Sequence, residues 1–194
     1  MTAAPSDVYP PPDGWTTDDL DAMPEDGQRR ELLDGVLIMS PSPTAYHQII
    51  AGRLMGALET GCPPTMCVTQ AVEVRINRRR SFIPDVLVVT DDAAARFPAK
   101  FEPHEVMLAV EIVSKTSVSM DRITKPALYA QAGIPYYWRI EVEDGLTVHT
   151  YKIDPIDEVY YGLGEFTDII DVTQPWAIKL PISRLTPKHL PPAR

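Results

Sequence analysis

The chain has 194 residues, of which 44% are hydrophobic and 23% are charged, and its formal net charge at pH 7 is −9. This composition is ordinary for a globular protein, and no apolar stretch reaches the ~18–20 residues of a membrane-spanning helix, which excludes a membrane partner. The acidic balance argues against a protein that binds nucleic acid over its whole surface, although residues 61–140 alone hold ten basic and eight acidic side chains.

Two further features predict where the protein works. Residues 1–12 lack the basic start and the apolar core of a signal peptide. Cys62 and Cys67 have no further cysteine or histidine close to them in the sequence. We therefore take them as reduced structural thiols rather than as a disulfide or part of a metal knuckle. Both observations predict a cytoplasmic protein.

The N-terminal part of the chain predicts an arm, a short helix and a hairpin. Residues 1–14 are rich in proline, which favours an extended arm. A threonine N-cap followed by two aspartates predicts a helix over residues 17–23. Two apolar runs around Asp34-Gly35 predict a β-hairpin over residues 30–39, with Glu31 at the start of its first strand.

The next helix carries a histidine. Ser40–Thr44 contains two prolines, which end the hairpin and lead into a helix cap. Apolar residues then recur at helical spacing from His47 to about Glu59. His47 lies in the first turn, where it either packs as an ordinary side chain on the apolar face or reaches a functional site.

Three strands follow, and two of them contain a carboxylate. Residues 66–76 alternate in polarity and predict one strand. Residues 82–90 predict the next strand, with Asp85 near its start. Residues 106–113 are apolar at both parities, which predicts a central strand covered on both faces, and they include Glu111.

The functional prediction depends on Asp85 and Glu111. An ionised carboxylate inside an apolar run costs several kcal/mol unless it is paired, hydrogen-bonded or bound to a metal. Two such groups on neighbouring strands would repel each other unless a cation lay between them. We therefore predict a divalent-metal site formed by these two side chains.

Arg75 and Arg78–Arg80 concentrate positive charge just before Asp85. Two interpretations of this basic run stay open. It is either the solvated tip of a hairpin or a loop that contacts phosphate.

The rest of the chain predicts one more helix and several short strands. Residues 124–133 predict a helix that is closed by a glycine. Residues 136–153 predict a hairpin around an Asp-Gly turn, short strands follow between residues 166 and 180, and residues 187–194 predict a loose tail. The whole order predicts one α+β domain over residues 15–186, in which a mixed sheet is flanked by helices.

Several short motifs follow one another along the chain: Arg30–Gly35, Pro41–Pro43 with His47, Pro84–Val86, Val110–Ser114, Asp121 with Lys125 and Tyr129, and Ala132–Trp138. In their order and spacing they resemble the Uma2 (DUF820) family, which is placed in the PD-(D/E)XK, restriction-endonuclease-like superfamily. The resemblance covers about residues 28–180. Each motif alone is weak, and their combination is fairly specific.

The resemblance implies a restriction-endonuclease-like core and a nuclease that depends on Mg²⁺ or Mn²⁺. It implies that Asp85 and Glu111 bind the metal, helped by a backbone carbonyl just after Glu111, that of Val113 or its neighbour Ile112. It also implies that Glu31 supplies a further acidic group.

One position departs from the superfamily pattern. The lysine expected two residues after the second acid is replaced by Val113. Lys125 on the following helix is our candidate for the missing lysine, because a helix holds a side chain more rigidly than a loop holds its rival Lys115. His47 completes the candidate catalytic set.

Three functions are compatible with these observations. The first is an endonuclease that hydrolyses phosphodiester bonds, with DNA as the expected substrate. The alternative is a catalytically inactive nuclease-fold module that binds nucleic acid or protein, which the missing lysine and the acidic charge favour. The third is an interaction protein that dimerises through an edge strand of the hairpin over residues 136–153, whose aromatic side chains fit an interface or a core.

Overall fold

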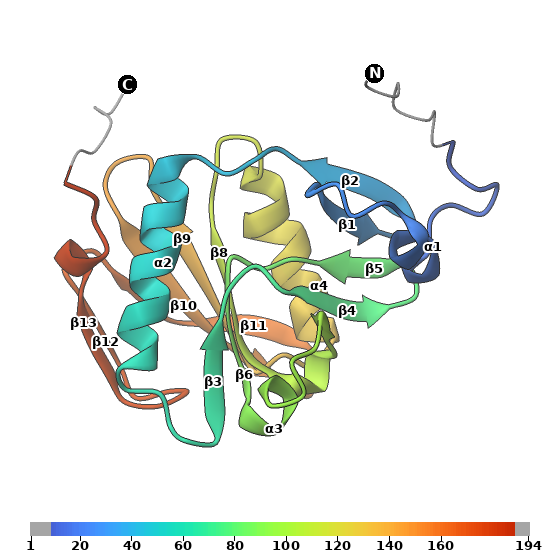
Figure 1. The fold of residues 1–194 in the computed structure, drawn as a ribbon. Coiled ribbons are helices and arrows are strands. Elements are labelled where there is room, and N and C mark those ends of the chain that lie inside the picture. The colour runs from blue at the N-terminus through green and yellow to red at the C-terminus, as the bar shows by residue number, and fades with distance from the viewer. Residues whose placement is uncertain (1–8, 189–194) are drawn as a thin grey trace.

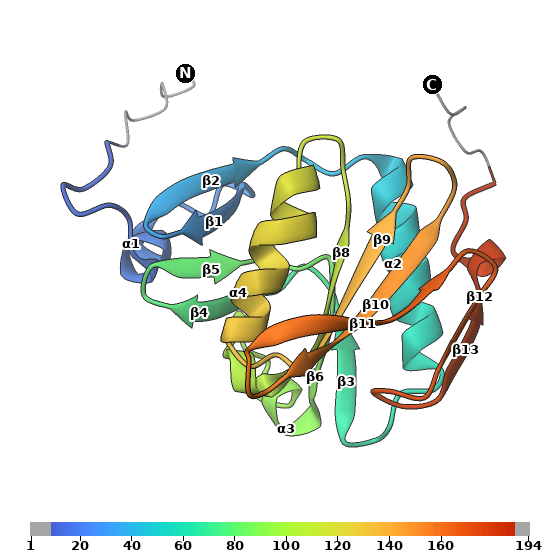
Figure 2. The ribbon, with the colours of Figure 1, turned by 180° about the vertical axis from the view of Figure 1, so that it is seen from behind.

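The computed structural model describes residues 9–188, in which helices lie on both faces of a central sheet (Figures 1 and 2). The helices are α1 (Thr17–Ala22), α2 (Ala45–Glu59), α3 (Asp91–Ala94) and α4 (Lys125–Gln131). Shorter helical turns span Pro103–Glu105, Met120–Thr124 and Ile182–Arg184. The strands are β1 (Arg29–Leu33), β2 (Val36–Ser40), β3 (Met66–Thr69), β4 (Glu73–Asn77), β5 (Arg80–Phe82), β6 (Val86–Thr90), β7 (Lys100–Phe101), β8 (Val106–Ile112), β9 (Tyr136–Glu141), β10 (Thr147–Asp154), β11 (Val159–Phe166), β12 (Ile169–Val172) and β13 (Ile178–Pro181).

The strands form three sheets. The central sheet has the order β11-β10-β9-β8-β6-β3, and it is mixed because β8 and β9 are parallel while the other pairs are antiparallel. A second sheet has the order β2-β1-β5-β4-β7, and β12 pairs with β13 in a third. The predicted α+β architecture with a mixed sheet and added hairpins is therefore confirmed.

Two hydrophobic clusters cover the two faces of the central sheet. Helix α2 covers one face and α4 covers the other (Figures 1 and 2). Leu108 and Val110 of β8 pack into the cluster with α2, whereas Ala109 packs into the cluster with α4. This two-sided burial confirms the prediction that the strand carrying Glu111 is central.

The first hairpin forms for the predicted reason. Its two-residue turn places Asp34 at φ 51° and Gly35 at φ 82°. Positive φ at both turn residues gives the twist that joins two antiparallel strands, and Asp-Gly accepts it at low cost. Leu33 then pairs with Val36, which sets the register of β1 and β2.

Two predicted strands are each divided between two sheets, which corrects the sequence analysis. The predicted strand over residues 66–76 is β3 in the central sheet and β4 in the second sheet, with Ala71 between them at φ 54°. The predicted strand over residues 82–90 is likewise split into β5 and β6. Proline lacks the N–H that a continuous ladder requires, so the chain crosses between the sheets at Ile83–Asp85. Asp85 therefore lies in a turn before β6.

The C-terminal part contains a strand that the sequence analysis missed. The hairpin over residues 136–153 forms as β9 and β10, but β11 pairs with the outer side of β10. Both hairpin strands thus have neighbours on both sides, so this hairpin offers no edge for a homodimer. Tyr137 and Trp138 are fully buried. These two aromatic side chains of the hairpin therefore belong to the core.

The basic run lies at the solvated tip between β4 and β5, and its side chains contact acidic partners in the first 34 residues. Arg75 donates to Asp21 at 2.9 Å and Arg78 donates to Asp18 at 3.0 Å. Arg80 contacts Asp34, and Arg79 donates to the main-chain oxygen of Asp34 at 2.9 Å. These contacts support the interpretation of a hairpin tip over that of a phosphate-contacting loop.

Some predictions concern the ends of the chain. Most of the predicted arm over residues 1–14 and of the tail over residues 187–194 lies outside the described residues. The limits of the predicted domain, residues 15–186, stay a prediction. Among residues 9–188, no helix is long and apolar enough to cross a membrane.

Candidate active site

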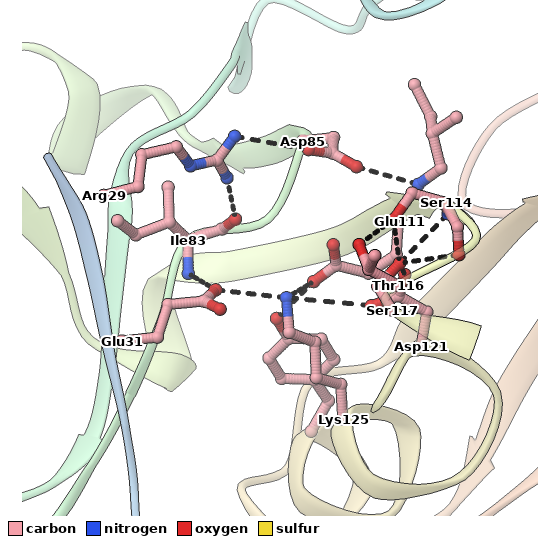
Figure 3. Close-up of polar contacts among 12 residues, drawn as sticks. Arg29, Glu31, Ile83, Asp85, Glu111, Ser114, Thr116, Ser117, Asp121 and Lys125 are labelled. Atoms are coloured by element: carbon pink, nitrogen blue, oxygen red, sulfur yellow. Dashed lines mark hydrogen bonds and ion pairs between the residues drawn. The ribbon is translucent and has the colours of Figure 1, made fainter. Parts of the chain in front are cut away.

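The predicted acidic residues and Lys125 meet where the two larger sheets join (Figure 3). Glu31 comes from β1, Glu111 from the end of β8 and Lys125 from the first turn of α4, while Asp85 lies in the turn before β6. All four residues are buried. Buried charged side chains are rare unless they are paired, so this cluster is a candidate functional site.

Lys125 joins the two glutamates. Its Nζ donates to Oε1 of Glu111 at 3.0 Å and to Oε1 of Glu31 at 3.1 Å. The hydroxyl of Tyr129, one turn later on α4, also donates to Oε1 of Glu111 at 2.7 Å. Lys115, the rival candidate, is exposed on the loop after β8. The geometry therefore favours Lys125 as the lysine of this site.

Asp121 helps to place the start of α4. Its Oδ1 lies 3.8 Å from Nζ of Lys125, and its other carboxylate oxygen accepts a hydrogen bond from the hydroxyl of Ser117. The hydroxyl of Tyr137 on β9 donates to the main-chain oxygen of Asp121 at 2.6 Å. These contacts tie the helix that carries Lys125 to the central sheet.

Asp85 is attached to the strand of Glu111. Its Oδ2 accepts a hydrogen bond from the N–H of Ile112 at 2.8 Å and lies 3.0 Å from Nε2 of His47. Its backbone N–H donates to the oxygen of Val110 at 3.0 Å. His47, in the first turn of α2, thus contacts the predicted site rather than only packing on the apolar face.

Strand geometry distinguishes the two backbone carbonyls after Glu111. The N–H of Ile112 points to Asp85, whereas the N–H of Val113 donates to the oxygen of Ile140 on β9 at 2.9 Å. In a strand, the N–H and C=O of one residue face the same neighbour. The carbonyl of Ile112 therefore lies on the side of Asp85, and that of Val113 does not.

The site carries an excess of negative charge. Four buried carboxylates, those of Glu31, Asp85, Glu111 and Asp121, are matched by one buried lysine and by the half-buried Arg29. Burial raises the pKa of Glu111 well above its ordinary value; Lys125 opposes this rise, and neighbouring carboxylates add to it. Burial likewise raises the pKa of Asp121 to about 6.

Two other groups of the site keep their charge. Burial would lower the pKa of Lys125, but the surrounding carboxylates, Glu111 first, outweigh it and raise the pKa. Burial would raise the pKa of Asp85, but the hydrogen bond and charge of His47 and the N–H of Ile112 outweigh it and lower the pKa. A divalent cation between Asp85 and Glu111 would offset this crowding of negative charge.

The donor atoms fit a hard divalent cation. Among residues 9–188, Oε2 of Glu111 accepts no hydrogen bond, and Oδ1 of Asp85 has only a 3.6 Å contact with Arg29. These two oxygens and the carbonyl of Ile112 are of the kind that Mg²⁺ binds, and Mg²⁺ keeps several waters besides. No three His, Cys, Asp or Glu side chains in the described part of the chain form a ready-made metal cluster.

Three contributors, Asp121, Tyr129 and Arg29, were not assigned a role from the sequence. Asp121 and Tyr129 lie four residues before and four residues after Lys125, which places them on its helical face. Arg29 lies two residues before Glu31 in β1, and alternate residues of a strand share a face. These spacings are visible in the sequence, but they point to site residues only once Lys125 and Glu31 are known to belong to the site.

The architecture of the chain is that of the restriction-endonuclease-like class. The fold resembles a crystal structure from Anabaena variabilis ATCC 29413 described as "a putative nuclease belonging to DUF820", with a TM-score of 0.69, 18% sequence identity, and coverage of 88% of this chain and 96% of that chain. The model of the Uma2 family, described as "Putative restriction endonuclease", matches residues 17–167. The chain therefore belongs to the Uma2 family, and the predicted resemblance is confirmed. No functionally curated protein matches the sequence.

Proposed function

We propose that the protein is a metal-dependent nuclease that hydrolyses phosphodiester bonds of DNA. The observation that supports this most directly is the buried Lys125 ammonium, hydrogen-bonded to Glu111 on the strand to which Asp85 is attached. The Uma2 family description supports the nuclease class, and restriction endonucleases act on DNA.

Asp85, Glu111 and the carbonyl of Ile112 are the groups that would hold Mg²⁺ or Mn²⁺. The ion would polarise a phosphoryl oxygen and lower the pKa of a bound water. His47 prepares Asp85 for this role. Since an ionised carboxylate oxygen only accepts, Nε2 of His47 carries the proton in its contact with Oδ2, and Oδ1 of Asp85 keeps only its 3.6 Å contact with Arg29.

Lys125 and Glu31 supply charge and position. The raised pKa of Lys125 keeps its ammonium charged near pH 7, so it can stabilise negative charge that develops on the phosphoryl group. Glu31 accepts hydrogen bonds from Lys125 and from the N–H of Ile83 at 2.8 Å. It thereby sets the distance between the lysine and the turn that carries Asp85.

The test is cleavage of plasmid DNA by purified protein with Mg²⁺ or Mn²⁺. We expect Asp85→Asn and Glu111→Gln to lower the rate by at least about 10²–10³-fold, the usual loss when a group that stabilises the transition state is removed. Asp171→Asn, on an exposed side chain paired with Lys179, is the matched control and should cleave normally. Metal-dependent cleavage that survives both site substitutions would refute the assignment.

The alternative of an inactive nuclease-fold module loses one of its two supports. It was favoured by the valine at the motif position of the lysine, and Lys125 occupies the site from the following helix. The acidic net charge remains as its support. Calorimetry tests the alternative. The proposed nuclease must bind Mn²⁺, so a titration that shows no Mn²⁺ binding would favour the inactive module.

Two coarser proposals concern the setting of the protein. We infer a cytoplasmic location, which the free thiols of Cys62 and Cys67 support, since such thiols persist in a reducing compartment. A homodimer would use β11, which is one of the two edge strands of the central sheet in the described part of the chain. Its exposed Val159, Tyr161 and Leu163 support this edge. Light scattering of the wild type and of Tyr161→Lys would test it.

A further inference from the structure

Arg29 is the second cation of the site, and its guanidinium is under-bonded. Its Nη2 donates to the main-chain oxygen of Ile83 at 2.7 Å. Within residues 9–188, its Nε is buried without a hydrogen-bond partner, and its Nη1 has only a 3.6 Å contact with Oδ1 of Asp85. A guanidinium has five N–H donors and can accept nothing, so one hydrogen bond leaves most of its capacity unused.

The two cations of the site differ in how they are held. Lys125 is 7% exposed and lies among three carboxylates, whereas the Arg29 side chain is 25% exposed. Figure 3 shows Arg29 beside Asp85 and Ile83, and Lys125 approaching Glu31 and Glu111 from the helix. Arg29 is therefore the more accessible of the two cations to a molecule arriving from solvent.

We propose that Arg29 binds the substrate phosphate group at this site through Nη1. The inference rests on the proposed nuclease function. A divalent cation on Oδ1 of Asp85 would take over the charge compensation that Arg29 now provides there and would repel the guanidinium. Nη1 would then be free to donate to a phosphate oxygen, a partner that suits the planar, permanently charged arginine. The hydrogen bond from Nη2 to Ile83 keeps the side chain anchored meanwhile.

A purely structural role for Arg29 makes the opposite prediction. If its task were to hold the turn at Ile83 and so to position Asp85, its removal would weaken metal binding and cleavage together. If it binds phosphate, its removal takes a positive charge away from Asp85, so metal affinity is unchanged or higher while cleavage falls. The sign of the change in metal affinity therefore separates the two roles.

The experiment compares Arg29→Gln, Arg29→Lys and Arg30→Gln. Arg30 is the neighbouring residue in β1, but its guanidinium pairs with Asp26 away from the site, which makes it the matched control. Mn²⁺ binding is measured by calorimetry without DNA, and single-turnover cleavage of a DNA duplex is measured at saturating Mn²⁺. Thermal unfolding shows that each variant is folded, and Arg29→Lys keeps the charge should the glutamine variant fail to fold.

We expect Arg29→Gln to cleave about 100-fold more slowly than the wild type, with Mn²⁺ affinity equal or higher. Arg29→Lys should keep part of the rate, and Arg30→Gln should match the wild type. The inference is overturned if Arg29→Gln cleaves as fast as Arg30→Gln, or if its Mn²⁺ affinity falls together with its rate. A wild-type protein that neither binds Mn²⁺ nor cleaves would instead refute the proposed nuclease function.

Discussion

The crowded carboxylates make a specific prediction about stability and pH. In the absence of metal, the protein should become more stable as the pH falls from 7 to about 4.5. Burial raises the pKa of Asp121 from its ordinary value of 3.8 to about 6, and the pKa of Glu111 is raised in the same direction. A carboxyl group with a higher pKa in the folded state binds its proton more tightly there, so protonation favours folding.

The magnitude follows from the shift of Asp121. About two pKa units, at 1.36 kcal/mol each, correspond to about 3 kcal/mol of stability that is lost as the pH rises from 3.8 through 6. This is a large part of a typical free energy of unfolding of about 5–15 kcal/mol. Carboxyl groups with lowered pKa act in the opposite sense, aspartates such as Asp85 below about pH 4 and Glu105 and Glu141 below about pH 4.5. Burial lowers the pKa of His149 from its ordinary value of 6.5, so this group opposes the trend below that pH.

Urea unfolding in EDTA at several pH values between 4.5 and 7 measures the effect. Asp121→Asn should flatten the profile and stabilise the protein at pH 7, because the asparagine oxygen can still accept the hydrogen bond from Ser117. Asp171→Asn should leave the profile unchanged. A metal-free wild type that is equally stable at pH 7 and pH 5, or an Asp121→Asn variant with the wild-type slope, would refute the reasoning.

Three further substitutions test the cluster. Glu111→Gln should abolish cleavage without destabilising the metal-free protein at pH 7, since it removes a crowded charge but keeps an acceptor for Tyr129; a clear loss in urea stability would contradict this. Lys125→Met should abolish cleavage and cost about 3–5 kcal/mol in urea unfolding, because it leaves buried carboxylates without their cation; near-wild-type stability would contradict the pairing. Tyr129→Phe should cost about 1 kcal/mol, the usual value of one hydrogen bond, and should lower Mn²⁺ affinity in calorimetry by loosening Glu111; an unchanged affinity would assign the hydroxyl to stability alone.

Local chemistry made several features predictable from the sequence. The Asp34-Gly35 turn defines its hairpin because few residues accept two successive positive φ values. Glu111 stood out because an apolar run that is buried on both faces does not normally contain a charge. The same argument found Asp85, although its position in a turn was not foreseen.

Other features depend on which segments pack together, and the sequence does not encode this locally. The alternation in residues 66–76 continues across the break between β3 and β4, so a period of two cannot show that this segment serves two sheets. Strand β11 was missed because its two glycines and exposed positions weaken the pattern. The outer edge of β10, which β11 covers, was therefore predicted to be free.

The candidate site shows the same division. The sequence singled out Asp85 and Glu111 as candidates, because the free energy of burying a charge is high wherever the strand lies, whereas Glu31 was implied only by the family resemblance. It left open whether Lys125 or Lys115 completes the site, since both follow Glu111 at plausible distances along the chain. Only the tertiary structure brings Lys125 into contact with Glu111 and leaves Lys115 exposed, and only it places Arg29 beside Asp85. These contacts join residues that are 14 and 56 positions apart, and such pairings arise only when the two sheets and α4 pack around one point.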